Sequence, residues 1–430
     1  MCMRSPPRSP SSPTILGSIA LFLLLSGTAV AQPTLDESQY VERVLSVSLE
    51  ARVAELEAAL GRAEAVGVGL WPNPELGWER QKTTSGTREG ESQDVLVASI
   101  PLVLSGRLGL EREAADQNAR AAEARHEWAR AGLRHEATRA FSAVLAARER
   151  RSILEQSLAE LRRLAEAIAT RERAGEAAGY DRLRIELEAA TVRDALRGAV
   201  LDEQQAEAQA LRLLGPGVTE LPSFKGSLQV ERPLPEGASL LAELEERRGD
   251  LRALALEASG AQAAQRAAGR GWIPEPSVRA GAQFLDVGLP GAGVGYVVGV
   301  GLPLPFFDRR QGEAARAEAR RGLAEARRAA LLHEARTRLA VVLEAVSGRR
   351  ERQARHRTDV LGRAQELRQI AATAYRGGGA ELLVLVDAER AAREALLTAV
   401  ELAVSLVEAE TDLLLLAGAY DGASPRSATR

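Results

Sequence analysis

Few side chains in this sequence of 430 residues have the types and spacing that site chemistry would need. The histidines could bind a metal, but all four fall in stretches with helical patterning and at spacings unlike those of a metal site: His126, His135, His333 and His356. The only cysteine, Cys2, and both methionines stand at the N-terminus. The sequence therefore predicts no metal site and no disulfide in the rest of the chain.

A glycine-rich run could in principle hold phosphate groups. Gly291, Gly293 and Gly295 form a G-x-G-x-G pattern. This run leads into a strand pattern, whereas a dinucleotide loop must open a helix whose N-terminus holds the phosphates. No Ser, His and Asp stand in the strand–turn–helix context of a hydrolase. We therefore expect no catalytic or cofactor-binding residue, and the net charge of −3 gives no electrostatic case for nucleic acid.

Residues 1–31 have the pattern of a cleaved secretory signal peptide. Arg4 and Arg8 precede an apolar run from residue 15 to residue 25, and Ala29-Val30-Ala31 supplies small residues for cleavage. No later apolar stretch approaches the ~20 residues of a membrane-spanning helix. An exported chain of this kind could therefore enter a membrane only through strands.

The clearest strand pattern lies between residues 271 and 313. Apolar residues alternate with polar residues or glycine in both halves of this stretch. They are Val278, Ala280, Ala282 and Phe284 in the first half, and Val294, Tyr296, Val298, Val300 and Leu302 in the second. Each run has about ten residues, the length of a tilted membrane strand. An apolar face opposite a polar one suits a strand between lipid and a lumen.

The same pattern occurs earlier in the chain. Trp71 and Trp272 are 201 positions apart, and Pro101 and Pro303 are 202 apart. The two halves therefore look like copies of one unit, a strand hairpin between long helices. Pro101, Pro303 and Pro305 mark the passage from strand to helix. An aromatic content of 3%, with Ala, Glu, Leu and Arg abundant, is typical of long helices and coiled coil.

Continuous helices are expected on both sides of each hairpin. They cover residues 35–69, 105–173 and about 181–214 in the first half, and residues 238–269, 309–375 and about 381–417 in the second. At 1.5 Å per residue, the helix from residue 105 would be on the order of 100 Å long. The predicted fold class is mainly α with a small β part.

These patterns divide the chain into five parts. They are a signal peptide (1–31), a first repeat (32–214) with strands near 74–84 and 94–104, a linker (215–236), a second repeat (237–420) with strands near 276–286 and 294–304, and a disordered tail (421–430).

The hairpins allow two interpretations, a small soluble sheet that caps a coiled coil or a set of membrane strands. The apolar faces have no partner in the sequence except helices that lead away, and the glycine-rich opposite faces would make a poor core. Both observations favour the membrane. Four strands cannot close a barrel, and an open strand edge cannot lie in lipid. At least two copies must therefore join.

Taken together, these features resemble the TolC-type outer-membrane efflux factors over essentially the whole chain after residue 31. The most specific motifs are W-P-N-P-E-L from Trp71 and L-P-L-P-F-F-D-R-R-Q-G-E from Leu302. The second motif is similar to the subgroup that works with cobalt–zinc–cadmium exporters. The resemblance implies a homotrimer whose twelve-stranded barrel lies in outer-membrane lipid and continues as a periplasmic α-barrel. It also implies a periplasmic adaptor (membrane fusion protein) and an inner-membrane RND-type pump as partners.

In that family, helix turns carrying a tyrosine, an arginine and two aspartates close the periplasmic end. Matching the Y-x-x-G and V-x-D-A patterns places Tyr375 at the tyrosine and Asp387 at the second aspartate. The first aspartate position holds Val384 and the arginine position holds Ala380, so the polar latch is incomplete. In the first repeat, Asp181 occupies the slot that matches Val384. The candidate gate residues are therefore Tyr375, Asp387 and Asp181.

We interpret the sequence as the outer-membrane channel of a tripartite efflux pump that extends into the periplasm. The subgroup resemblance points to heavy-metal cations as substrates. One alternative is a duct for drugs, other small molecules or type I secretion. Another is a periplasmic coiled-coil adaptor, although adaptors have one helical hairpin between β-rich halves and this chain has two helical repeats. An enzyme is the least favoured class.

Overall fold

The computed structural model describes residues 34–86, 90–173, 179–228, 237–286 and 293–420. The expected signal peptide, the turn before residue 179, the end of the linker and the expected tail lie outside these ranges. The described elements are β1 (Thr34–Leu35), α1 (Glu37–Val47), α2 (Leu49–Val66), β2 (Glu75–Lys82), β3 (Ser92–Pro101), α3 (Arg107–Arg173), α4 (Gly179–Leu213), β4 (Ser223–Phe224), α5 (Gly237–Arg247), α6 (Gly249–Ala268), β5 (Ser277–Asp286), β6 (Gly293–Gly301), α7 (Gln311–Arg355), a π-helical turn (His356–Leu361), α8 (Gly362–Arg376) and α9 (Leu382–Leu416).

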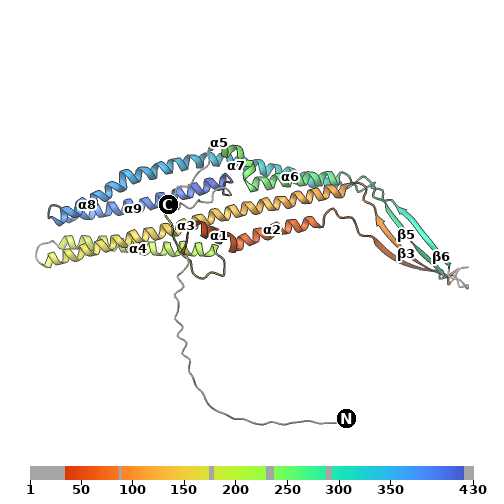
Figure 1. The fold of residues 1–430 in the computed structure, drawn as a ribbon, viewed down its shortest axis with the longest axis horizontal. Coiled ribbons are helices and arrows are strands. Elements are labelled where there is room, and N and C mark those ends of the chain that lie inside the picture. The colour runs from red at the N-terminus through yellow and green to blue at the C-terminus, as the bar shows by residue number, and fades with distance from the viewer. Residues whose placement is uncertain (1–33, 87–89, 174–178, 229–236, 287–292, 421–430) are drawn as a thin grey trace, which may run out of the picture. The chain divides into compact units, whose positions relative to one another are not determined.

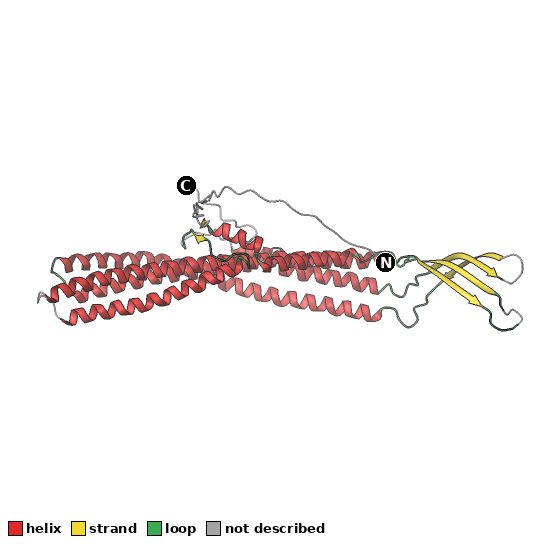
Figure 2. Ribbon diagram, turned by 90° about the horizontal axis from the view of Figure 1, so that it is seen from below, coloured by secondary structure: helices red, strands yellow, loops and turns green. Residues whose placement is uncertain are grey.

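The long helix α3 lies at the centre of the helical part. It packs against α2 and α6 along its N-terminal half and against α4 and α9 along its C-terminal half, while α7 packs against α6 and α9. Within residues 34–420 the four-stranded sheet follows one end of these helices, and the C-terminal ends of α3 and α8 lie at the other end (Figures 1 and 2). None of the described helices has the length and apolar character needed to cross a membrane.

The helices before each hairpin are broken, which the sequence analysis did not predict. Ser48 ends α1 and begins α2, because its extended backbone (ψ 146°) interrupts the helix and its hydroxyl accepts a hydrogen bond from the Ala51 amide. Arg248 separates α5 from α6 in the same way, with a ψ of 116°. The single helices expected over residues 35–69 and 238–269 were therefore wrong. The break at Ser48 has no Gly or Pro to signal it, whereas the break at Arg248 is followed directly by Gly249.

The helix expected over residues 309–375 is also interrupted. Six residues, His356–Leu361, form a π-helical turn between α7 and α8. The imidazole Nε2 of His356 lies 2.9 Å from the carbonyl oxygen of Ala395 on α9. Such a turn inserts an extra residue into the helical ladder, and Gly362 follows it directly as the first residue of α8.

An aromatic cluster joins the start of the chain to the linker. Phe224 packs against Tyr40 and Phe141, with ring centroids 4.8 Å and 4.6 Å apart. The buried Tyr40 hydroxyl donates a hydrogen bond to the Ala210 carbonyl oxygen at 2.8 Å. Strands β1 and β4 pair in parallel beside this cluster. The linker therefore contributes a short strand and a core residue where the sequence showed little periodicity.

The main sheet is antiparallel, in the order β2-β3-β5-β6. The hairpin of each repeat contributes two strands, and β3 pairs with β5 to join the repeats. Ala98 of β3 is directly opposite Ala280 of β5, and Ala280 is directly opposite Val298 of β6. Strands β2 and β6 are left as the two edges of the sheet.

Candidate functional site

One face of the sheet is apolar and exposed along its whole length. On β6 the exposed fractions of Val294, Tyr296, Val298 and Val300 are 73%, 85%, 70% and 68%. The register places further apolar residues on the same face, and these are Leu76, Trp78, Leu96, Ala98, Ile100, Val278, Ala280, Ala282 and Phe284. A continuous apolar face of this kind on a water-soluble chain is unusual and marks a surface that another phase or partner covers.

The opposite face of the sheet carries polar residues, glycines and a few valines. Gly281 allows a close approach there, since a Cβ at this position would lie 2.0 Å from the Leu96 carbonyl oxygen. The guanidinium of Arg279 lies over Gly299 on the neighbouring strand. The two faces thus differ as expected for strands with lipid on one side and a lumen on the other.

The passage from strands to helices is held by a group of charged side chains. Arg107, at the start of α3, makes two parallel contacts with Glu275 just before β5, at 2.7 Å and 3.1 Å. The Ser105 hydroxyl also donates to Glu275 at 2.7 Å. Burial favours the neutral form of Glu275, but the hydrogen bonds from Arg107 and Ser105 outweigh it and hold the pKa of this carboxyl below its usual value.

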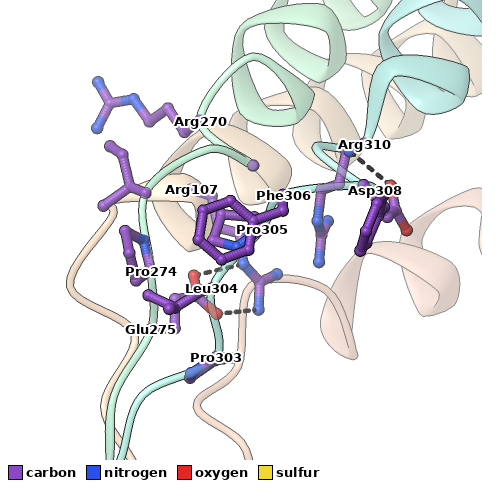
Figure 3. A pocket seen from close by; sticks show the side chains of 13 residues that line it. Arg107, Arg270, Pro274, Glu275, Pro303, Leu304, Pro305, Phe306, Asp308 and Arg310 are labelled. Carbon is purple, nitrogen blue, oxygen red and sulfur yellow. Dashed lines mark hydrogen bonds and ion pairs between the residues drawn. The ribbon is translucent and has the colours of Figure 1, made fainter.

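These residues border an open cavity of about 430 Å³ (Figure 3). Pro303 and Pro305 line it together with Phe306, and Pro101 is the last residue of β3. Pro101 therefore ends a strand, and Pro303 and Pro305 lie in the segment that connects β6 to α7. Phe307 is 94% exposed beside the cavity.

The three candidate gate residues lie at the other end of the helices. The guanidinium carbon of Arg171 on α3 lies 5.5 Å from the ring centre of Tyr375 on α8. Asp387 on α9 is exposed, and its carboxylate is 3.8 Å from Arg184 on α4. Asp181 is partly buried in the first turn of α4. Its carboxylate there interacts favourably with the positive end of the helix dipole. Tyr375 contacts the first repeat through Arg171, and Asp387 contacts it through Arg184.

Sequence reasoning missed a buried ion cluster close to this end. Glu188 on α4 is 6% exposed and accepts hydrogen bonds from Arg390 and Arg393 of α9, the latter at 2.8 Å. Arg393 also donates to the Ser157 hydroxyl of α3 at 3.2 Å. Arg390 and Arg393 are three positions apart, so the sequence places them on one helix face. This spacing is the only sign of the cluster in the sequence, and it does not identify Glu188 as their partner.

Burial penalises the charged form of Glu188, but the hydrogen bonds from the two arginines outweigh this penalty and lower the pKa of the carboxyl. In the part of the chain that the structure describes, no group of three or more His, Cys, Asp or Glu side chains could hold a metal ion.

Several solved outer-membrane proteins share this fold. The structure of CusC matches with a TM-score of 0.73 and 19% identity, covering 90% of this chain and 93% of that one. The outer-membrane protein VceC of Vibrio cholerae matches with a TM-score of 0.71 and 18% identity, over 89% of this chain and 96% of that one. The fold is therefore that of a TolC-type channel subunit.

The family follows from the sequence. The family model described as "outer membrane efflux protein" matches residues 42–216 and 240–419, and the chain belongs to this family. The resemblance inferred from the motifs is thus confirmed, and the protein is an outer-membrane protein that extends into the periplasm. The cobalt-zinc-cadmium resistance protein CzcC of Cupriavidus metallidurans is 28% identical over 267 residues. That alignment spans 62% of this chain and 61% of CzcC, which is less than two thirds of the relative.

Proposed function

We propose that this chain is the subunit of a homotrimeric efflux channel. The sheet carries the proposal, because its apolar face is exposed and, among the described residues, the outer edges of β2 and β6 have no neighbouring strand. Backbone groups at an open edge cannot be left in lipid, so the sheet must close with other copies. Three copies of four strands give a barrel of twelve, which is within the range of outer-membrane barrels.

The helical part would continue this barrel through the periplasm to a periplasmic adaptor and an inner-membrane pump of the RND type. Both partners are proposed from the family, and the turns after α3 and α8 are the proposed contact end. Tyr375, Asp387 and Asp181 are the proposed gate residues there. Contacts from Tyr375 and Asp387 to the first repeat support this placement, since they join the two helical hairpins of one chain.

Heavy-metal cations are the proposed substrates. The support is the similarity to a cobalt-zinc-cadmium resistance protein. Metal selectivity would come from the pump, because the described residues contain no metal-binding group.

The assembly is tested by fractionation and by native mass measurement in mild detergent. We expect the protein in the outer-membrane fraction with the mass of three chains. A soluble periplasmic monomer with its strands intact would contradict the proposal and favour a coiled-coil adaptor.

The substrate is tested by deleting the gene and measuring growth inhibition by cobalt, zinc and cadmium salts and by a panel of dyes and antibiotics. Loss of metal tolerance alone is expected. Unchanged metal tolerance with higher drug sensitivity would replace the metal assignment by drug efflux.

A further inference from the structure

The cavity at the passage from strands to helices is not used by any step of the proposed channel. Its lining comes from three connecting segments, which are the start of α3, the chain between α6 and β5, and the chain between β6 and α7 (Figure 3). Arginines and exposed apolar side chains border the same space of about 430 Å³. A basic pocket with an apolar wall is a typical site for the headgroup of a lipid.

The lengths of the strands place this cavity relative to a bilayer. Strands β3 and β5 have 10 residues each. A tilted membrane strand needs about 9–11 residues to cross the hydrocarbon, so the residues just before β5 and just after β3 lie at the level of the headgroups. Trp71 and Trp272 precede β2 and β5 and are both exposed, and tryptophan is enriched at this level of a membrane.

The apolar face of the sheet continues past the end of β6 to the cavity. Leu302, Leu304 and Phe306 keep the two-residue spacing of the apolar residues of β6, and all three are exposed. Leu304 and Phe306 also line the cavity. An acyl chain that lies on the apolar face would therefore bring its headgroup to this cavity.

Two arginines here keep most of their hydrogen-bond donors unused. Arg270 donates from Nη1 to the Ser105 carbonyl oxygen at 2.7 Å, and Arg309 donates from Nε to the Pro305 carbonyl oxygen at 3.3 Å. Among the described residues, neither guanidinium has a carboxylate within ion-pair distance, and both side chains are exposed. A guanidinium has five N–H donors in a planar fork that fits the oxygens of a phosphate.

The charge that faces the cavity is positive. Its lining includes three arginines and two carboxylates, and Arg309 adds a further guanidinium beside Pro305. Glu275 is bound by Arg107, and the Asp308 carboxylate accepts a hydrogen bond from the Arg310 amide at 2.8 Å. An anion would therefore be attracted by Arg270 and Arg309 and repelled chiefly by Asp308.

Two glycines give these arginines their positions. Gly106 has a φ of 70°, and a Cβ at this residue would lie 2.5 Å from Nη1 of Arg270. A Cβ at Gly271 would lie 2.6 Å from the carbonyl oxygen of Arg309. Any larger residue would push the arginines away, so the arrangement depends on glycine at both positions.

We propose that this cavity binds the phosphate of an anionic phospholipid, with Arg270 and Arg309 on the phosphate oxygens and an acyl chain along Phe306 and the apolar face of the sheet. A free anion would use only the arginines and would leave the apolar wall uncovered. The inference goes beyond the proposed channel and rests on it only for the position of the sheet in the membrane.

Native mass spectrometry of the full chain in mild detergent tests the site, with phosphatidylglycerol as the probe. Arg270→Gln and Arg309→Gln should each weaken binding about fivefold, the effect of one arginine near an anionic lipid. Arg266→Gln is the matched control, because Arg266 lies one helical turn before Arg270, does not line the cavity and pairs with Glu113. Its affinity for the lipid should equal that of the wild type.

Two further variants separate the headgroup from the acyl chain. Asp308→Asn keeps an oxygen for the Arg310 amide but removes the opposing charge, so it should tighten binding about twofold. A gain of this kind cannot come from a misfolded protein. Phe306→Ala should weaken phosphatidylglycerol binding severalfold, whereas Tyr180→Ala, an exposed aromatic at the other end of the helices, should leave it unchanged.

Two probes identify the source of the phosphate. Diacylglycerol with the same acyl chains carries no phosphate and should bind less tightly than phosphatidylglycerol, with no response to either arginine variant. Inorganic phosphate should not displace the lipid at equal concentration. Equal binding of diacylglycerol would mean that the apolar face alone takes lipid, and displacement by inorganic phosphate would mean a site for a free anion. Either result would overturn the proposal, as would unchanged lipid affinity in both arginine variants.

These outcomes are separable from those for the proposed function, because lipid binding is measured whatever the mass of the assembly. A monomer that binds phosphatidylglycerol through Arg270 and Arg309 would end the trimer proposal and leave this one. A trimer without arginine-dependent binding would do the reverse. Binding to dissociated chains only would show that a second copy fills the cavity, which would also overturn the lipid site.

Discussion

Glu188 joins the two helical hairpins through buried charges, and its environment predicts an acid effect on stability. Its pKa is lowered in the folded protein, so its contribution is present above the unfolded-state pKa of about 4.3 and is lost as the pH falls through the lower folded pKa. Glu188→Gln should cost about 2 kcal/mol at neutral pH, because it removes charged hydrogen bonds from two arginines. It should also flatten the decline of stability in acid, measured by thermal unfolding in detergent.

The matched control for this change is Glu186→Gln. Its side chain is 50% exposed and pairs with Arg182 on the same helix. A surface pair of this kind contributes little, so unfolding of this variant should follow the wild type at all pH values. If the stability of Glu188→Gln falls with pH in the same way as that of the wild type, other carboxylates cause the loss of stability in acid.

Tyr375 and Asp387 predict different effects on conduction. Three copies of Asp387 near a narrow axis would attract cations, although Arg184 at 3.8 Å offsets part of each charge. Asp387→Ala should therefore weaken block of single-channel current by divalent cations. Tyr375→Ala removes the ring that lies under Arg171 and should raise conductance. If neither current changes in planar bilayers, these side chains do not line the narrowest part of the channel.

At the scale of elements, the sequence predicted long uninterrupted patterns well and local breaks poorly. Helix α3 runs from Arg107 to Arg173, close to the range expected, because a proline-free stretch of strong helix formers has no competing structure. The breaks at Ser48 and Arg248 depend on backbone geometry and on packing against neighbours, which composition does not encode. The turn His356–Leu361 is hidden for the same reason.

The candidate site was predictable to a similar extent. The alternation of apolar and small residues on β5 and β6 was enough to predict which residues form the exposed apolar face. Successive side chains of a strand point to opposite faces of the sheet, so each residue has only two possible placements. The contact between Glu188 and Arg390 was not predictable, because it joins residues 202 positions apart through tertiary packing. The prolines were found because they cannot belong to the interior of a helix or strand.

The sheet makes a prediction about its two faces. Val298 is 70% exposed on the apolar face, and its neighbour Val297 points to the other face. Val298→Arg should cost about 2–4 kcal/mol if the position is near the bilayer midplane, whereas Val297→Arg should cost less because it faces a polar lumen. Folding into lipid vesicles, followed by denaturant titration, measures both. Equal costs for the two variants would contradict the assignment of the faces.

At the scale of the whole molecule, the two repeats produce a sheet with open edges, and the described residues include no group of three or more His, Cys, Asp or Glu side chains that could hold a metal ion. Each repeat supplies two strands and a helical hairpin, and the edges that remain are the ones another copy can fill. A channel of this kind needs no selective site, because a tightly held ion would leave slowly and limit the flux. Recognition of cargo would then belong to the pump, and the channel would provide passage.

This division of roles predicts how the purified trimer behaves toward metals. The described residues contain no cluster of metal ligands, so titration with Zn²⁺, Co²⁺ or Cd²⁺ in a calorimeter should show no saturable binding at micromolar concentrations. Isolated surface carboxylates would give only weak, salt-dependent uptake. Asp387→Ala should lower that weak uptake slightly and leave the shape of the titration unchanged. Stoichiometric binding at micromolar zinc would contradict the prediction and would assign part of the metal selectivity to the channel itself.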